Sequence, residues 1–575
     1  MPLSSTHPLG NRASVLLSSV FGPYAQDDEY GSRTINPMEL YHNQVTRVQG
    51  ELSLRMFHRS FGLMLIQANL TGPCTLLDFP TMDRFVEEIR TNRYDVIGIS
   101  GIIPNVGKVK KMCELVRTHS PRSTIVVGGH VVNHSDIDRV IDADHIVKGD
   151  GVRWFREYLG DDPDAPVRHP KALSGFGTRI LGHNVKDGPS ETAAILIPSV
   201  GCPVGCNFCC TSALFGGKGH FVNFYETGDE LFAVMADIAE TLGTESFFVL
   251  DENFLLHRKR ALRLLELMTE NDKSWSIYVF SSGRVIQSYT IEQLIGLGVS
   301  WVWMGLEGEG SGYRKLKDVD TRDLVRELQS HGIRVLGSSI IGLESHTPEN
   351  IGAAIDYAVS HDTVFHQFML YTPNPGTPLY ETHKRQGTLK HDFPVADAHG
   401  QYRFNYRHPS IPDGDEEQFL IEAFQRDFEV NGPSLARLIR VTLDGYLRYR
   451  NHPDPRIRRR FRREGRSLKT EYAAAVWAMA ARYRGEEAAH RKLRTLLREI
   501  YAAAGPLTRL FAPLAGRYLS YTLRRERRRL ADGMTLEPKC WYELNPAARA
   551  RSERRPETAG NTALTPRHGV AGVKA

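Results

Sequence analysis

Short apolar runs alternate with longer amphipathic stretches between residues 61 and 160. The apolar runs predict strands over residues 61–68, 94–100, 123–127 and 144–148. Between them, residues 82–91, 106–118 and a short segment near 136–140 carry apolar side chains at helical spacing. Strands that alternate with helices are typical of a doubly wound, Rossmann-like parallel sheet.

Small residues follow three of these strands, at their predicted carboxyl ends: Ser100-Gly101, Gly128-Gly129-His130 and Gly149. Ligands of doubly wound sheets bind at this edge, and glycine lets a flat ligand approach the backbone closely. The pattern fits a structural domain with tight turns equally well. His130 could contact a ligand, although a lone histidine is more often structural.

A second alternation covers residues 191–390. It predicts six strands, over residues 194–197, 246–250, 275–280, 300–305, 335–341 and 366–371. Polar residues follow these strands, among them Asp251, Glu252, Asn253 and Glu307. We therefore expect a (β/α)6 partial barrel whose active site lies at the carboxyl ends of the strands.

Three cysteines follow the first of these six strands in a C-x3-C-x2-C spacing: Cys202, Cys206 and Cys209. Thiolates at such short spacings hold iron–sulfur clusters. A structural zinc site needs a fourth ligand, for which no partner pair follows, and seven cysteines in a long chain argue against disulfides. Three ligands would leave one iron open. The neighbouring Cys210 cannot easily point the same way and is interpreted as structural.

This loop resembles that of the radical S-adenosylmethionine (SAM) superfamily, including the aromatic Phe208 before the last cysteine. The resemblance implies a 4Fe-4S cluster on Cys202, Cys206 and Cys209, with SAM on the open iron. It also implies SAM contacts from Asp251, Glu252 and Asn253 at the amino end and from Glu307 at the ribose. The stretch 338–344 departs from the family pattern, which puts SAM contacts from that loop in doubt.

The segments 125–130 and 147–151 resemble the cobalamin-binding domain that precedes many radical SAM cores, and 371–380 resembles the last-strand signature of those cores. The resemblance implies cobalamin at Ser100, Gly101, Gly128, Gly129, His130 and Gly149. The D-x-H-x-x-G motif is absent, which argues against the usual histidine ligand to cobalt. A degenerate domain that binds nothing remains an alternative.

Amino-acid composition is informative mainly in the C-terminal quarter of the chain. The net charge is only +5 over 575 residues, but arginine concentrates in a helical region between residues 437 and 529. Apolar patches at 473–481 and 507–519 separate its basic runs. A solvated helical subdomain, an anionic membrane surface and RNA phosphates all fit this pattern, and of the two ligands the apolar patches favour the membrane.

The chain should therefore comprise an N-terminal extension (1–60), a cobalamin-binding-like domain (61–160), a linker (161–190), a radical SAM core (191–390), a helical Arg-rich domain (391–547) and a disordered tail (548–575). Neither a secretory signal nor an apolar run of membrane-spanning length is evident. We expect a cytoplasmic protein. The more specific expectation is that it binds peripherally to the inner face of the membrane.

The favoured function is a cobalamin-dependent radical SAM methyltransferase that methylates an unactivated carbon of a lipid or secondary metabolite. It would take electrons from a donor such as a ferredoxin or flavodoxin. One alternative is a radical rearrangement, coupling or ring-forming reaction without methyl transfer. Another is a cluster- and corrinoid-binding regulator that contacts nucleic acid. The sequence identifies no catalytic acid or base and no substrate.

Overall fold

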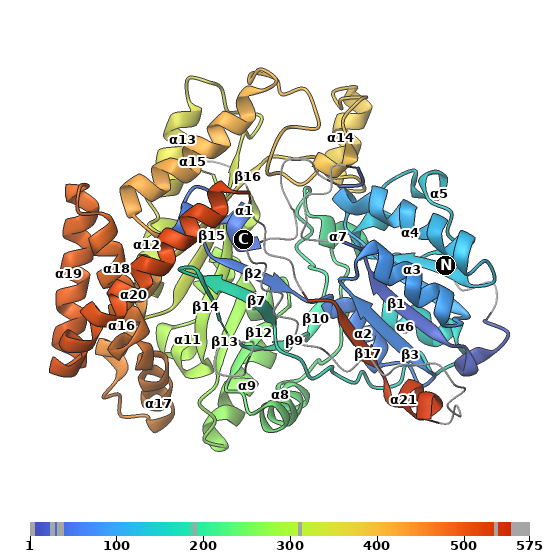
Figure 1. The fold of residues 1–575 in the computed structure, drawn as a ribbon, viewed down its shortest axis with the longest axis horizontal. Coiled ribbons are helices and arrows are strands. Elements are labelled where there is room, and N and C mark those ends of the chain that lie inside the picture. The colour runs from blue at the N-terminus through green and yellow to red at the C-terminus, as the bar shows by residue number, and fades with distance from the viewer. Residues whose placement is uncertain are drawn as a thin grey trace, which may run out of the picture.

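Two six-stranded sheets form the framework of the protein in a computed structural model (Figure 1). The structure describes residues 6–22, 29–31, 40–185, 188, 192–308, 313–533 and 539–553. The first sheet and its helices lie on the right of Figure 1, the second sheet lies near the centre, and the C-terminal helices cover the left side.

The first sheet has the strand order β17-β3-β1-β4-β5-β6. Its five parallel strands are β3 (Cys74–Asp78), β1 (Val15–Ser19), β4 (Val96–Ser100), β5 (Thr124–Gly128) and β6 (His145–Ile146). Alternate strand residues pack on helices α3 (Met82–Thr91) and α4 (Val106–His119) on one face. The other face packs on α2 (Phe61–Ala68) and α6 (Gly151–Tyr158), as a doubly wound sheet requires.

The prediction of a strand over residues 61–68 is wrong, because this segment is helix α2. Its residues are apolar almost throughout, and a short apolar run cannot distinguish a buried strand from a buried helix. Leu63, Met64 and Leu65 are unbranched at Cβ and favour a helix. The strand of this region is instead β3, which begins after Pro73.

The proposed boundary at residue 61 also needs correction. Strand β1 lies between β3 and β4, inside the first sheet, so the sheet does not begin after the predicted N-terminal extension. Strand β2 (Arg55–His58) pairs with β7 (Gly175–Ile180), which extends into β8 (His183–Asn184). The predicted linker 161–190 therefore contributes two strands to a small antiparallel sheet.

The second sheet is entirely parallel, with the order β16-β15-β14-β13-β12-β9. The six predicted strands all form, as β9 (Ala194–Leu196), β12 (Ser246–Val249), β13 (Ser276–Ser281), β14 (Val299–Glu307), β15 (Arg334–Ile341) and β16 (Phe365–Leu370). Aliphatic residues of β9 and β12–β15 form one core with α8 (Gly228–Leu242), α9 (Arg258–Glu270), α11 (Ile291–Leu297) and α12 (Thr321–Ser330). The remaining crossover helix, α13 (Ile351–Val359), packs with residues of β15 and β16.

Local sequence signals set the ends of these crossover helices. Helix α8 starts with a capping box between Thr227 and Glu230 and ends at Gly243 in a left-handed conformation. Helix α11 repeats the arrangement with Thr290, Gln293 and Gly298. Such caps satisfy the free backbone groups at helix ends, so each crossover returns to the sheet at a defined residue.

The C-terminal region is mostly helical, as predicted, and includes α16 (Ser434–Tyr449), α17 (Pro455–Glu464), α18 (Glu471–Arg482), α19 (Glu487–Ala504) and α20 (Pro506–Ala531). Strand β17 (Trp541–Leu544) is a correction to that description, because it returns to the first sheet and pairs antiparallel with β3. Residues 546–553, placed mainly in the predicted disordered tail, form helix α21. The rest of that tail lies outside the described residues.

Helix α20 is anchored to the small sheet by Glu526. Burial would raise the pKa of this carboxyl, but hydrogen bonds from Arg529 and Arg179 lower it to about 2. Because the folded pKa lies below the ordinary value of 4.5, the stabilisation is present at neutral pH and decreases as pH falls from about 4.5 to 2.

We expect Glu526→Gln to reduce the free energy of unfolding by about 2 kcal/mol, because it removes the carboxylate charge that Arg179 and Arg529 both contact. Denaturant unfolding at pH 7 measures this loss. The exposed pair of Arg84 and Glu87 offers a control, since Glu87 is 64% exposed and Glu87→Gln should change stability little. Equal losses in the two variants would contradict the assigned role of Glu526.

Candidate functional site

The cysteine loop connects β10 (Ser199–Val200) to α7 (Cys210–Leu214). Gly205 has a φ of +64°, and a Cβ atom there would lie 2.4 Å from the Cα of Lys218. The amide of Gly219 donates to the carbonyl of Pro203 at 3.0 Å, and that of Cys209 donates to the carbonyl of Cys206 at 3.1 Å. Gly205 is therefore required where two parts of the loop lie against each other.

Cys202, Cys206 and Cys209 are partly buried free thiols. Burial and the neighbouring thiols raise the pKa of Cys202 to about 11, and burial also raises that of Cys206. Cluster binding would displace these protons. Among the described residues no three His, Cys, Asp or Glu side chains converge on a single ion. A 4Fe-4S cluster needs no such convergence, since each thiolate binds a different iron. A tight loop with three free thiols fits such a cluster.

Cys210 occupies a different environment from the three preceding cysteines. Burial raises the pKa of its thiol to about 12. Its backbone carbonyl accepts a hydrogen bond from Asn133 Nδ2 at 3.0 Å. This residue therefore joins the cysteine loop to the first sheet, consistent with the structural interpretation.

Asp251 and Asn253 are buried and held by protein contacts. Asp251 Oδ2 accepts hydrogen bonds from Ser199 Oγ and Arg260 Nη2, each at 2.6 Å, and its Oδ1 accepts one from the amide of Asn253 at 3.0 Å. Asn253 Oδ1 accepts a hydrogen bond from Ser281 Oγ at 3.0 Å. These contacts engage both carboxylate oxygens of Asp251 and order the loop after β12.

Glu307 lies beside the cysteine loop and forms an ion pair with Lys315. The Nζ atom of Lys315 lies 5.5 Å from the centre of the Phe208 ring. Burial opposes the charge on this lysine, but Glu307 and Cys206 raise its pKa. Lys315 is a further residue of this site, and no motif around it identifies it from the sequence.

A cavity of about 330 Å³ lies at the carboxyl edge of the first sheet. Five of the six predicted cobalamin residues line it: Ser100, Gly128, Gly129, His130 and Gly149. The sixth, Gly101, packs behind it, since a Cβ there would lie 2.7 Å from a methyl group of Val109. Gly128 faces open space, because a Cβ on it would meet only the carbonyl of Val147, at 3.7 Å.

The same cavity is closed on another side by the segment after the cysteines. Thr211, Leu214 and Phe215 line it, and His130 Nε2 lies 3.2 Å from Thr211 Oγ1. Glu252 also lines it, and its Oε2 atom is buried without a hydrogen-bond partner among the described residues. Burial raises the pKa of Glu252 to about 8. The open glycine edge and this carboxyl fit a large polar-edged cofactor held between the first sheet and the cysteine loop.

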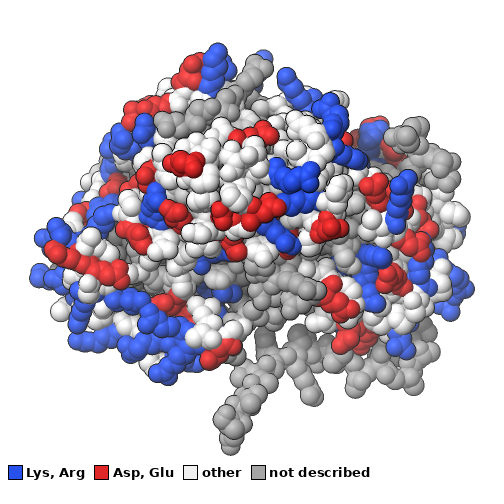
Figure 2. Space-filling model, turned by 90° about the horizontal axis from the view of Figure 1, so that it is seen from above, with Lys and Arg blue, Asp and Glu red and all other residues white. Residues whose placement is uncertain are grey.

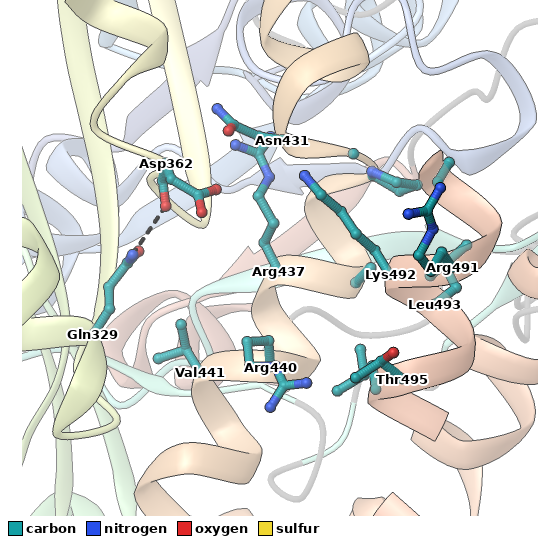
Figure 3. Close-up of a pocket in the computed structure, with 15 residues that line it drawn as sticks. Gln329, Asp362, Asn431, Arg437, Arg440, Val441, Arg491, Lys492, Leu493 and Thr495 are labelled. Atoms are coloured by element: carbon teal, nitrogen blue, oxygen red, sulfur yellow. Dashed lines mark hydrogen bonds between the residues drawn. The ribbon is translucent and has the colours of Figure 1, made fainter. Parts of the chain in front are cut away.

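A basic cavity of about 430 Å³ is lined mainly by the C-terminal helices α16 and α19 (Figure 3). Arg437 and Lys492 extend in the same direction from α16 and α19. However, Arg437 pairs with Asp427, Arg440 pairs with Glu499, and Lys492 donates to the carbonyl of Val430. Its cations are thus engaged by the protein, and we assign no ligand to it.

Two regions of the chain match known protein families. Residues 53–159 match the B12 binding domain, and residues 196–358 match the radical SAM superfamily. The chain is therefore a radical SAM enzyme with a B12-binding domain, and its cofactors are a 4Fe-4S cluster, SAM and cobalamin. The predicted fold class and family resemblance are confirmed.

Individual proteins resemble this chain only at low sequence identity. An uncharacterized methyltransferase of Pyrococcus horikoshii is 26% identical over 50% of this chain and 69% of its own. The bacteriochlorophyllide d C-12(1)-methyltransferase of Chlorobaculum tepidum is 27% identical over 33% of this chain and 42% of its own. Among solved structures, the radical SAM methyltransferase TsrM of Kitasatospora setae is 15% identical, with a TM-score of 0.49 over 79% of this chain and 99% of that chain.

Proposed function

We propose that this enzyme methylates an unactivated carbon of a lipid or secondary metabolite. The observation that carries the proposal is the shared wall between the cavity of the first sheet and the cysteine loop, made by Thr211, Leu214 and Phe215. When bound, the cluster and SAM supply hydrogen abstraction, and the corrinoid supplies a transferable methyl group. A shared wall would place these two chemistries next to each other, as methyl transfer to a radical centre requires.

In this proposal each group of residues has a separate task. Cys202, Cys206 and Cys209 hold the cluster, while Glu307 and Asn253 bind SAM, with Lys315 orienting Glu307. Asp251 positions the loop after β12 through its ion pair with Arg260. Ser100, Gly128, Gly129, His130 and Gly149 border the corrinoid, with Gly101 packed behind them, and Glu252 donates or accepts a hydrogen bond at its edge.

Labelled SAM tests the reaction. The anaerobic enzyme, a reductant such as flavodoxin and SAM labelled in its methyl carbon should yield labelled product and S-adenosylhomocysteine from an accepted substrate. 5′-Deoxyadenosine together with an unlabelled, rearranged product would support the ring-forming alternative instead. Salt-sensitive binding to RNA without SAM cleavage would support the alternative of a cluster- and corrinoid-binding regulator.

We propose a peripheral membrane position through helix α20. Six large apolar side chains on one face of this helix are between 44% and 79% exposed: Leu507, Leu510, Phe511, Leu514, Tyr518 and Tyr521. Arg525 and Arg528 continue the same face, and no ion pair engages them among the described residues. Figure 2 shows basic side chains gathered at the end of the molecule that the C-terminal helices form.

An apolar stripe that continues into arginines fits an anionic bilayer surface. It would lie on that surface, since no helix in the described ranges is long and apolar enough to cross a membrane. We expect the double substitution Leu510→Asp and Leu514→Asp to weaken binding to phosphatidylserine-containing vesicles at least about tenfold, because it places two charges in the apolar stripe that would contact the bilayer.

Vesicle co-sedimentation at low salt measures this effect. Leu447, which is 42% exposed on α16, provides the control substitution Leu447→Asp. Equal binding of the double variant and the wild type would contradict the assigned surface, and so would equal weakening by the control. RNA binding that survives the double substitution while vesicle binding is absent would favour nucleic acid instead.

A further inference from the structure

A second interior cavity, of about 250 Å³, lies between the second sheet and the small sheet formed by β2, β7 and β8. Phe248, Tyr278, Trp301, Trp303, Leu336 and Phe365 contribute the wall from the second sheet. The opposite wall includes Met56, His58, Thr178 and Ile180. We call this space the aromatic chamber.

The chamber is separate from the cofactor site. Tyr278, Trp301 and Leu336 are each the third residue of their strands, β13, β14 and β15. The chamber therefore lies toward the amino ends of these strands, whereas the cysteine loop follows the carboxyl end of β9. A row of hydrogen-bonded side chains borders the chamber at Trp303. Trp303 Nε1 donates to Ser338 Oγ at 2.8 Å, and Ser338 Oγ donates to Gln367 Oε1 at 2.8 Å.

The walls of the chamber are formed largely by flat rings. Trp301 and Phe365 stack with centres 5.3 Å apart and planes 15° from parallel. His58 and Phe248 stack at 5.6 Å and 20°, and Tyr278 meets Trp301 edge to face at 6.3 Å. Phe248, Tyr278, Trp301 and Trp303 remain only partly buried, although they lie on the inner face of the sheet.

Protein interiors contain few voids larger than a water molecule, so ordinary core packing would fill a space of this size. An empty cavity of this size lowers the stability of the folded protein. A cavity lined by aromatic rings is typical of a ligand site. A cavity of about 150 Å³ with apolar walls binds benzene. By that measure, the aromatic chamber has room for about two fused rings.

A polar side chain of the small sheet, Thr178, would orient a ligand in the chamber. The Oγ1 atom of Thr178 is buried and has no hydrogen-bond partner among the described residues. A buried hydroxyl without a partner is costly, and a ligand that supplies the missing hydrogen bond removes this cost. The chamber should therefore prefer a ring compound with one polar substituent over the bare hydrocarbon.

We propose that the aromatic chamber is a binding site for a flat, apolar compound of about two fused rings that carries one hydrogen-bonding group. The rings lie between the stacked aromatic pairs, and the polar group bonds Thr178. This site goes beyond the proposed methyl transfer, and it requires neither the cluster nor cobalamin.

The test uses the full-length protein and 2-naphthol, with binding followed by quenching of tryptophan fluorescence and by calorimetry. We expect saturable binding of one 2-naphthol per chain. Thr178→Trp fills the chamber and should weaken binding at least tenfold. Thr178→Val keeps the shape but removes the hydroxyl, and it should weaken 2-naphthol several-fold while leaving naphthalene unchanged.

Thr118→Trp, on the exposed side of α4, should leave binding unchanged and serves as the matched control. Circular dichroism and the melting temperature report whether each variant folds. If Thr178→Trp does not fold, Thr178→Val still decides the question. Absent saturable binding, or a 2-naphthol affinity equal in wild type and Thr178→Val, would overturn the proposal. Both results are independent of SAM cleavage, so a failure of the methyltransferase proposal would be recognised separately.

Discussion

Cys206→Ala is expected to abolish reductive cleavage of SAM. The substitution removes one of three cluster ligands, whereas loss of a mere supporting contact already lowers metal affinity or activity about 10- to 100-fold. We therefore expect a loss of more than about 100-fold in 5′-deoxyadenosine formation, together with loss of the brown cluster absorbance. After anaerobic reconstitution, absorbance and iron analysis measure the cluster, and a single-turnover assay measures the 5′-deoxyadenosine formed.

Cys210→Ala is the matched control for this experiment, because Cys210 is adjacent in sequence but buried, with a pKa of about 12. It should keep the cluster absorbance and lose no more than a small part of the activity. A Cys206→Ala variant with full iron content and SAM cleavage would refute the ligand assignment. So would a Cys210→Ala variant that loses both.

Much of the framework could be predicted from the sequence because its signals are local. All six strands of the second sheet form where apolar runs precede polar residues, and the capping residues define the helices between them. Residues 61–68 were misassigned because an unbroken apolar run has no period. Strand β17 could not be predicted, since it is stabilised by pairing with β3 rather than by its own pattern.

The candidate site shows the same limit at the level of single residues. The cysteine spacing and the glycines at strand ends are local patterns, and the structure brings five of the six predicted cobalamin residues to one cavity. The engagement of Asp251 by Arg260 could not be read from the strand pattern, since the pair depends on how helix α9 packs. Lys315 was missed for the same reason, because only the fold places it beside Glu307.

Gly128→Leu should remove bound cobalamin while leaving the cluster in place. Gly128 lines the cavity of the first sheet, and a Cβ there meets nothing closer than 3.7 Å, so a leucine can be built without a backbone clash. Its side chain would then fill space that the corrinoid needs. We expect cobalamin content to fall at least about tenfold, since a misfit of only ~1.4 kcal/mol already has this effect on an equilibrium constant.

The measurement is the ratio of cobalamin to iron in protein purified without oxygen from cells supplied with cobalamin. Gly485→Leu is the control, because Gly485 also has open space around it but lies among the C-terminal helices, between α18 and α19. Normal cobalamin content in Gly128→Leu would place the corrinoid elsewhere. Equal loss of cobalamin and iron would instead indicate that the substitution disturbs the wall shared with the cysteine loop. A selective loss of cobalamin would show that the corrinoid binds against Gly128 and that the cluster assembles without it, as two separate cofactor sites that share a wall require.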